Sequence, residues 1–535
     1  MKIGIAQGNP AVGDIKGNLV KIKTLVLEGE KAGAEIILFP ELFLSGYPPE
    51  DLLYNPSFLK DVELAVEEIR RISKTVKTAI VVGLPLKGKG KKLHNSVLVF
   101  NHGKTITRYD KIDLPNYGVF DECRYFSPGE PHQSGSCFTL NETTFGLTVC
   151  RDIWSGNNAP YSPLKQCDII LNLSSSPFYK EKYHKRIEIA ANFAKHFGKK
   201  LIYANLVGGQ DELVFDGNSI VCNEEGEVCA FYPPFQEGLF LYDTNNNKPV
   251  ECKRDAYGDI LEALKLGLQD YLSKNGFHEV VIGLSGGVDS ALTAAIAALA
   301  LGKERVKCVL MPSKFSSQGS VEHSMELAKN LGIETFTVPI EPMNASFLES
   351  LTPHFAGKPF DTTEENLQAR LRGVTLMSFS NKFNWLLLTT GNKSEVSVGY
   401  CTLYGDMCGG YSLIKDLYKT EVYELCRFIN KKHDNIIPEI IITKEPSAEL
   451  REDQKDSDSL PDYDTLDAIL TAYIEETQPI EEIIALVKNE KLVKRIIRLV
   501  DLNEYKRRQA PPGVKISSLA FGKDRRLPIT NGYRQ

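Results

Sequence analysis

Short runs of apolar and β-branched residues recur along residues 1–245, and most of them end at or directly before proline, glycine, asparagine or serine. Apolar residues at helical spacing predict helices over 17–34 and 180–197. Residues 219–230 are typical of a hairpin with its tip at 223–226. The mixture predicts an α/β sandwich. The runs bounded by turn residues predict strands at 2–7, 35–40, 78–83, 96–100, 145–150, 168–173 and 200–205.

A polar stretch at 243–249 interrupts this pattern and predicts a linker. We expect domains at 1–245 and 255–535, joined by a linker at 246–254. Residues 449–467 are acidic and polar, and we expect a loop over a site or a partly mobile segment there. Beyond the linker, expected helices alternate with expected strands, which is the pattern of a doubly wound parallel sheet. The helices are expected at 255–274, 289–302, 320–332 and 363–382, and the strands at 279–284, 305–311, 334–339 and 384–390.

Composition narrows the class of protein. A chain of 535 residues is long enough for two or three domains. The net charge of -6 gives no electrostatic reason to expect a nucleic-acid partner. The longest apolar run, 291–302, is too short to cross a membrane. The 11 cysteines are scattered and include no Cys-x-x-Cys pair, which favours a reducing cytoplasm and argues against a disulfide framework and a zinc site.

The strongest chemical motif lies between an expected strand and an expected helix. Adjacent glycines let backbone N–H groups close on an anion, and the helix N-terminus favours negative charge. Asp289 alone would repel phosphate, which predicts that it holds Mg²⁺. The motif lacks the Gly-Lys-Ser/Thr ending of a Walker A loop, and the alternative is a packing turn without a ligand. The candidate anion-binding residues, which the resemblance given next assigns to ATP, are Gly283, Leu284, Ser285, Gly286, Gly287, Val288, Asp289 and Ser290.

This loop resembles that of the N-type ATP pyrophosphatases, which split ATP between the α and β phosphates and transfer AMP. Residues 363–373 and 388–406, followed by 416–421, 446–450 and 458–463, are similar to the NAD synthetases among them. The resemblance covers nearly all of 255–535 and implies a Rossmann-like domain of the adenine nucleotide α-hydrolase type. It implies ATP contacts at Thr390, Lys419 and Ser447, deamido-NAD contacts at Asn366, Arg370, Glu395 and Lys506, and Mg²⁺ held by Asp289 and Glu395. Leu403 departs from the shorter, ammonia-using members, in which a lysine contacts the dinucleotide.

Three residues in the first half, which the resemblance described below groups as one set, have the chemistry that covalent amide hydrolysis needs. Glu41 follows an expected strand, Lys111 lies in the stretch 109–122, and Cys150 ends another expected strand. A covalent route needs a soft nucleophile that forms a thioester, a general base, and a cation that favours the thiolate and the oxyanion. A cysteine at a strand end is, by itself, more often a small core residue.

The stretches 39–47, 109–122 and 147–154 resemble the nitrilase superfamily, and the resemblance spans residues 1–245. It implies an αββα sandwich with Glu41, Lys111 and Cys150 as the catalytic set. It also implies that Tyr117, Ser176 and Lys182 bind glutamine.

Together the two halves imply a glutamine-dependent enzyme. The small-molecule substrates expected are L-glutamine, ATP and deamido-NAD, with release of glutamate, AMP, pyrophosphate and NAD. Free ammonia is mostly ammonium at neutral pH, so we expect guided transfer between the sites. The resemblance implies a homo-oligomer built on dimers of the synthetase domain. The cysteines favour a cytoplasmic location, and the charge and the short apolar runs predict no nucleic-acid or membrane partner. The alternatives are another amidotransferase, such as a GMP or asparagine synthetase, and a scaffold with inactive sites.

Overall fold

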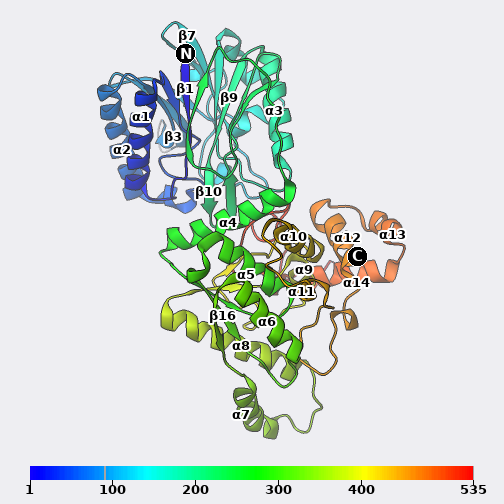
Figure 1. Ribbon diagram of the computed structural model, residues 1–535. Coiled ribbons are helices and arrows are strands. Elements are labelled where there is room, and N and C mark those ends of the chain that lie inside the picture. Colours follow the sequence, from blue (N-terminus) through cyan, green and yellow to red (C-terminus); the bar gives the residue numbers. More distant parts are fainter. Residues whose placement is uncertain (89–91, 534–535) are drawn as a thin grey trace. The chain divides into compact units, whose positions relative to one another are not determined.

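The computed structural model of the protein describes residues 1–88 and 92–533 (Figure 1). The chain divides into two units, Met1–Ala256 and Tyr257–Gln535. Residues 246–254, the expected linker, are counted within the first unit.

The first unit contains, among its described residues, two six-stranded sheets. The sheets have the orders β14-β1-β2-β3-β4-β5 and β13-β12-β9-β8-β7-β6, and β10 pairs with β11 beside them. The strands are β1 (Lys2–Gln7), β2 (Ile36–Leu38), β3 (Ala79–Lys87), β4 (Leu93–Asn101), β5 (Lys104–Asp110), β6 (Cys137–Leu140), β7 (Thr143–Val149), β8 (Ile169–Ser174), β9 (Lys200–Asn205), β10 (Val207–Gln210), β11 (Leu213–Asp216), β12 (Ile220–Cys222), β13 (Val228–Phe231) and β14 (Gly238–Asp243).

Each of the seven strands expected from the apolar runs is present, five of them with shifted ends. The hairpin is confirmed, because β12 pairs antiparallel with β13. The closing strand β14, which pairs antiparallel with the first strand of the chain, was not expected.

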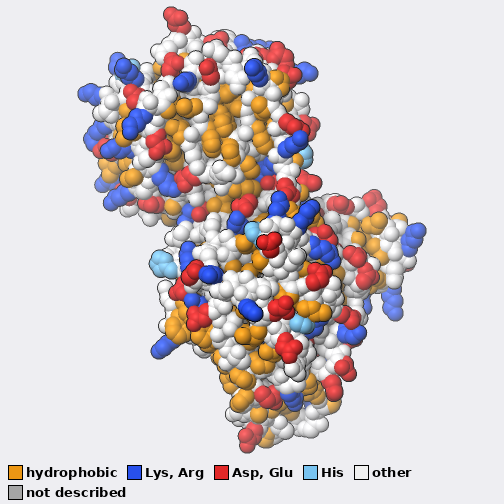
Figure 2. All heavy atoms as spheres, in the orientation of Figure 1, with side chains coloured by type: hydrophobic (Ala, Val, Ile, Leu, Met, Phe, Trp, Pro, Cys, Tyr) orange, Lys and Arg blue, Asp and Glu red, His pale blue; other side chains and the backbone are white. Residues whose placement is uncertain are grey.

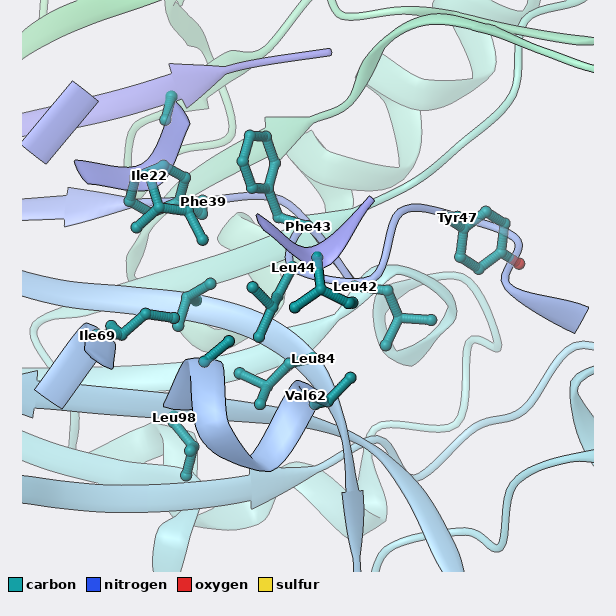
Figure 3. Close-up of a cluster of buried hydrophobic side chains, with 14 of the residues drawn as sticks. Ile22, Phe39, Leu42, Phe43, Leu44, Tyr47, Val62, Ile69, Leu84 and Leu98 are labelled. Atoms are coloured by element: carbon teal, nitrogen blue, oxygen red, sulfur yellow. The ribbon is translucent and has the colours of Figure 1, made fainter. Parts of the chain in front are cut away.

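Helices cover the outer faces of both sheets and complete an αββα sandwich. The helices α1 (Ile15–Ala32) and α2 (Pro56–Thr75) lie on one side, and α3 (Lys182–Phe197) lies on the other (Figure 1). In Figure 3, Ile22 of α1 and Val62 and Ile69 of α2 belong to one apolar cluster with Leu84 and Leu98 of the sheet. A second cluster joins the inner faces of the two sheets, and a third lies under α3. The αββα expectation is confirmed.

The second unit is organised around one parallel sheet with the order β17-β16-β15-β18-β19. All four pairings are parallel. The strand order runs outward in both directions from β15, which is the doubly wound topology that the alternating pattern predicts. The strands are β15 (Val280–Gly283), β16 (Val306–Leu310), β17 (Glu334–Thr337), β18 (Leu386–Thr389) and β19 (Tyr411–Ser412).

The four helices expected in this half are present, and further helices follow the sheet. A separate apolar cluster joins α9, α12, α13 and α14. The prediction of a loop over 449–467 is wrong for residues 463–467, since α12 begins at Tyr463. The helices are α4 (Ala256–Asn275), α5 (Val288–Leu301), α6 (Gln318–Leu331), α7 (Glu341–Leu351), α8 (Thr362–Phe383), α9 (Lys393–Val398), α10 (Lys419–Lys432), α11 (Glu439–Thr443), α12 (Tyr463–Leu470), α13 (Ile480–Val487), α14 (Glu490–Leu502) and α15 (Glu504–Arg507).

The surface carries charges of both signs. Acidic and basic side chains are interspersed on the face drawn in Figure 2, as the small net charge of -6 leads one to expect. In the part of the chain that the structure describes, no helix combines the length and apolarity needed to span a membrane.

Candidate functional site

Cys150 lies where β7 ends and opens the short turn η4 (Cys150–Ile153). Its φ of 41° is in the left-handed region, which side chains other than glycine rarely adopt. The carboxylate of Asp152 holds the turn by accepting a hydrogen bond from the N–H of Val149 at 2.8 Å. The Cys150 side chain is almost fully buried. A buried thiol on a strained and tightly held backbone is typical of a functional position.

Glu41 and Lys111 form a buried ion pair in the same unit. Lys111 Nζ donates to Glu41 Oε1 at 2.7 Å. Glu41 also accepts hydrogen bonds from Asn95 Nδ2 at 2.7 Å and from the N–H of Ser175 at 2.9 Å. Glu41 and Lys111 lie on separate segments of the chain. The fold brings them together, as expected for members of one catalytic set.

A second carboxylate, Glu122, belongs to this cluster and was missed in the sequence. Lys111 Nζ donates to both of its oxygens, at 2.9 and 2.8 Å. The Tyr47 hydroxyl donates to it at 2.9 Å. Burial, together with the charge of Glu41, raises the pKa of Glu122 to about 7, although Lys111 opposes the rise. In the sequence, Glu122 is distinguished only by its position as the last residue of the stretch 109–122.

The Cys150 thiol lies in the field of this cluster. Burial and the charges of Glu41 and Glu122 raise its pKa, while Lys111 and the N–H of Ser175 lower it. The balance raises the pKa of Cys150 to about 12. Lys111 therefore favours the thiolate as expected, but the thiol as a whole stays protonated at neutral pH. A base has to remove the proton as the thiol reacts.

The three residues expected to bind glutamine lie on segments that adjoin this cluster. Tyr117 is half-exposed, and Arg151 of the η4 turn donates to its hydroxyl at 2.9 Å. Ser176 is buried just beyond the end of β8. Lys182 begins α3 and donates from Nζ to the Pro177 carbonyl at 2.7 Å.

In the second unit, the loop 283–290 connects β15 to α5. The strand order of the sheet reverses between β15 and β18, and ligands of doubly wound sheets bind at such a point. Ser290 Oγ donates to the Gly287 carbonyl at 3.0 Å and lies 3.0 Å from Ser285 Oγ, which fixes the curve of the loop. Gly286 has a φ of 80°, and a Cβ there would lie 2.5 Å from the Ser320 carbonyl oxygen. The loop therefore requires glycine at this position.

Asp289 and Glu395, the expected metal ligands, share one lysine. Lys419 Nζ forms an ion pair with Asp289 and lies 3.3 Å from Glu395 Oε1. Asn392, which was not expected, donates from Nδ2 to Asp289 Oδ1 at 2.8 Å. Burial and the charge of Asp289 raise the pKa of Glu395 to about 8, against the effect of Lys419. One lysine does not neutralise two carboxylates, so a cation would be stabilised beside Asp289 and Glu395.

The donor set suits Mg²⁺ only in part. Carboxylate oxygens are the hard ligands that Mg²⁺ prefers. Within residues 1–88 and 92–533, however, no three His, Cys, Asp or Glu side chains are grouped so that they could hold a metal ion. Asp289 and Glu395 therefore fit a Mg²⁺ whose other ligands are nucleotide phosphates and water, as is common for this ion.

A cavity of about 590 Å³ opens beside the loop. Three of the expected residues do not line it, and these are Gly286, Ser290 and Arg370. Gly286 and Ser290 shape the loop from behind. The expected residues that line the cavity are Gly283, Leu284, Ser285, Gly287, Val288, Asp289, Thr390, Lys419, Ser447, Asn366, Glu395 and Lys506.

Arg370 is exposed and donates from Nε to the Leu403 carbonyl at 3.3 Å. The structure therefore does not bring Arg370 into the cavity of this single chain. Two other residues expected to contact deamido-NAD are anchored at the cavity wall. Asn366 Oδ1 accepts from Thr402 Oγ1 at 2.7 Å, and Lys506 Nζ donates to the Gly399 carbonyl at 2.7 Å.

Glu449, which was also missed, ties the acidic segment to the cavity. Its Oε1 accepts from Ser320 Oγ at 2.7 Å and from Lys444 Nζ at 2.9 Å. Its Oε2 accepts from the N–H of Ser317, the N-cap of α6, at 3.2 Å. Glu449 and Ser447 both line the cavity, so this contact positions the segment that carries Ser447.

Two protein-family models match the chain, one for each unit. The model described as carbon-nitrogen hydrolase matches residues 2–250, and the model described as NAD synthase matches residues 260–510. The glutamine-dependent NAD(+) synthetase of Acinetobacter baylyi is 44% identical over 544 residues, which is 100% of this chain and 99% of that protein. The protein of the same description from Thermotoga maritima is 43% identical over 576 residues, with 100% and 99% covered.

Solved structures agree with these matches. The glutamine-dependent NAD+ synthetase of Acinetobacter baumannii, solved in complex with ADP, aligns with a TM-score of 0.79 at 42% identity, over 99% of this chain and 98% of that chain. A glutamine-dependent NAD(+) synthetase from Cytophaga hutchinsonii aligns with a TM-score of 0.86 at 22% identity, over 99% and 98%. The second likeness concerns the fold alone.

Proposed function

The chain belongs to the family of glutamine-dependent NAD(+) synthetases, and from this premise we propose how its two sites divide the reaction. The first unit releases ammonia from L-glutamine. The second unit uses ATP to join that ammonia to the carboxylate of deamido-NAD. The products are NAD, glutamate, AMP and pyrophosphate.

In the first unit, Cys150 attacks the side-chain amide carbon of glutamine. Glu41 accepts the thiol proton, and the proton then goes to the leaving amine, so that ammonia departs and a thioester forms. Lys111 stabilises the negative charge on the oxygen of the tetrahedral intermediate. Water, deprotonated by Glu41, then attacks the thioester and releases glutamate. The pKa of about 12 supports this sequence, because Cys150 enters as a thiol and needs the base.

In the second unit, the loop 283–290 binds the phosphates of ATP through its N–H groups and the N-terminus of α5. Thr390, Lys419 and Ser447 complete the nucleotide contacts. Asp289 and Glu395 hold Mg²⁺, which supplies charge neutralisation at the phosphates. The carboxylate of deamido-NAD attacks the α phosphorus, pyrophosphate leaves, and ammonia then displaces AMP. Asn366, Glu395 and Lys506 bind the dinucleotide at the cavity wall.

One observation carries the proposal. A single chain holds a buried thiol beside a carboxylate–lysine–carboxylate cluster and, in its other unit, a glycine-rich loop at the switch point of a doubly wound sheet. The first arrangement suits amide hydrolysis and the second suits nucleotide activation. Neither chemistry alone requires the other, and their pairing in one chain is what a glutamine-dependent ligase needs.

The experiment compares two variants with two nitrogen sources. Cys150→Ala is expected to lose NAD formation from glutamine and to keep NAD formation from a high concentration of an ammonium salt. Asp289→Ala is expected to lose both, since it disturbs ATP binding. NAD, AMP and glutamate are measured together. Loss of both activities in Cys150→Ala would contradict the division of roles, and so would normal turnover in Asp289→Ala.

We also propose a homo-oligomer built on synthetase units and a cytoplasmic location. Arg370 lies outside the cavity of the single chain, as it would if a second copy completed the dinucleotide site. All 11 cysteines lie in the described part of the chain and are free thiols, which suits a reducing compartment. Sedimentation of the purified protein as a monomer would contradict the first point.

A further inference from the structure

Three buried charges form a chain of ion pairs in the first unit. Asp216 Oδ1 accepts from Arg186 Nη2 at 2.8 Å, and Asp216 Oδ2 accepts from Arg254 Nη1 at 2.8 Å. The three side chains are 1%, 1% and 2% exposed. Burying charged groups is costly unless they are paired and hydrogen-bonded, so a cluster that is removed from water to this extent calls for a function or a structural reason.

The cluster joins three separate segments. Asp216 ends β11, Arg186 lies on α3, and Arg254 lies in the expected linker, two residues before α4 begins. Arg254 is held there by more than its ion pair. Its Nη1 also donates to Asn218 Oδ1 at 3.1 Å, and its guanidinium lies 5.0 Å from the centre of the Tyr183 ring. The last part of the linker is therefore anchored inside the first unit.

The other end of the cluster reaches the residues proposed to bind glutamine. Arg186 Nη2 donates to the Ser176 carbonyl at 3.4 Å. Asn205 fixes the same residue from the other side, since its Oδ1 accepts from the Ser176 N–H at 2.8 Å. Lys182 lies four residues before Arg186 on α3, and residues at this spacing share one face of a helix. Arg186 thus fixes both Ser176 and the turn of α3 that carries Lys182.

Electrostatics make the three charges interdependent. Although burial raises it, Arg186 and Arg254 together hold the pKa of Asp216 down to about 2. Arg186 Nη1 also donates to Asp216 Oδ2, at 3.2 Å, so this oxygen is shared by the two arginines. Removing Arg254 would leave both oxygens of the buried Asp216 to Arg186, whose guanidinium would be drawn toward the vacated side of the carboxylate. Removing one partner of a buried ion pair disturbs the structure more than the net stabilisation by the pair suggests, because the remaining charge stays buried with less compensation.

We propose that Arg254 is a positioning residue for glutamine: through Asp216 it holds Arg186, and Arg186 holds Ser176 and Lys182 in the geometry that binds the amino acid. This inference rests on the proposed glutaminase function. It gives the expected linker a role in substrate binding, and it places that role immediately before the first helix of the synthetase unit.

The test uses Arg254→Met, with Arg254→Lys as the conservative variant and Lys253→Met as the matched control. Lys253 is the neighbouring residue, and its side chain is 79% exposed. We expect Arg254→Met to raise the KM for glutamine about tenfold or more, with kcat changed about twofold at most. Arg254→Lys should raise the KM for glutamine less than Arg254→Met does, and Lys253→Met should have the KM of the wild type. NAD formation from an ammonium salt should be unchanged in all three.

A second measurement separates positioning from general stability. Cys150 is labelled with iodoacetamide, a small alkylating agent, and with a glutamine analogue that carries a diazoketone. In Arg254→Met, labelling by the analogue should slow about tenfold, and labelling by iodoacetamide should stay within about twofold of the wild type. Equal slowing of both, an unchanged KM, or the same effect in Lys253→Met would overturn the inference. If wild-type protein released no glutamate from glutamine, the proposed function itself would fail, and this outcome is distinct from the others.

Discussion

At the level of single residues, both sites place one buried lysine between two carboxylates. Lys111 lies between Glu41 and Glu122 in the first unit. Lys419 lies between Asp289 and Glu395 in the second. In each case two negative charges compete for one positive charge, and one carboxylate has a pKa raised to about 7 or 8. Above the pKa of that carboxylate, the cluster has a surplus negative charge, which acts on the groups beside it.

Beside the first cluster lies the Cys150 thiol, and this leads to opposite effects of one substitution. Glu41→Gln removes the proposed base, so glutamine hydrolysis should fall by at least about a hundredfold. The same change removes a charge that raises the pKa of Cys150. Each unit by which that pKa falls increases the thiolate fraction about tenfold at a given pH below it. Alkylation of Cys150 by iodoacetamide should therefore become faster in the less active protein.

The measurement is the alkylation rate between pH 7 and 9, with glutamate release recorded on the same samples. In the wild type the rate should rise with pH through this whole window, because the pKa of about 12 lies above it. Glu122→Gln is the companion variant, since Glu122 also raises the pKa of Cys150. Slower alkylation in Glu41→Gln would mean that the carboxylate activates the thiol before substrate binds.

At the level of elements, apolar patterns predict most strands but not their partners. The runs at 2–7 and 200–205 coincide with β1 and β9, because each is a short apolar stretch between turn residues. The pairing of β1 with β14 joins residues at the two ends of the unit, and nothing local to either strand specifies it. The segment 463–467 was expected as part of a loop because its acidic composition masked the apolar stripe of α12, whose Leu466 and Ile469 are buried.

The site residues divide in a similar way. Those that lie in motifs, such as Cys150 and Asp289, could be named from the sequence. Glu122, Glu449 and Arg254 could not, because no local pattern in the sequence pairs them with the side chains that they contact in the fold. A buried carboxylate or arginine has the same appearance in a sequence as an exposed one. Such residues are found only when the fold shows which charges face each other.

Glu449 allows a test of how one segment is fixed against a helix. It accepts hydrogen bonds from Ser317, Ser320 and Lys444, and it lies at the N-terminus of α6, where a negative charge is favoured. Glu449→Gln keeps the shape but removes the charge. We expect the KM for ATP to rise about tenfold, because hydrogen bonds to a charged group contribute more than neutral ones.

ATP saturation curves with an ammonium salt as nitrogen source measure this effect without the first site. Glu452→Gln is the control, since Glu452 lies on the same segment and is exposed. Glutamate release by the first unit should be the same in both variants. An unchanged KM for ATP in Glu449→Gln would show that Ser447 keeps its place without this contact.

At the level of the whole molecule, the two units have separate cores and separate chemistry, and ammonia is the one compound that must pass between their sites. In water near neutral pH, ammonia is mostly protonated and cannot attack an adenylate. If the ammonia first escaped into solvent, its attack on the adenylate would therefore be slow, because the concentration of free ammonia would be low. The pairing of both units in one chain makes sense if ammonia stays with the molecule that released it.

Mixing two complementary variants tests this directly. Cys150→Ala retains the proposed synthetase site, and Asp289→Ala retains the proposed glutaminase site, so the mixture contains every catalytic group on different chains. With guided transfer, the mixture should release glutamate from glutamine and form NAD at less than about a tenth of the wild-type rate. Glutamate release by Asp289→Ala alone is the control for a working first site, and adding an ammonium salt should restore NAD formation in the mixture. NAD formation at the wild-type rate without that salt would mean that ammonia travels through solvent or between copies, and that the joining of the two units serves another purpose.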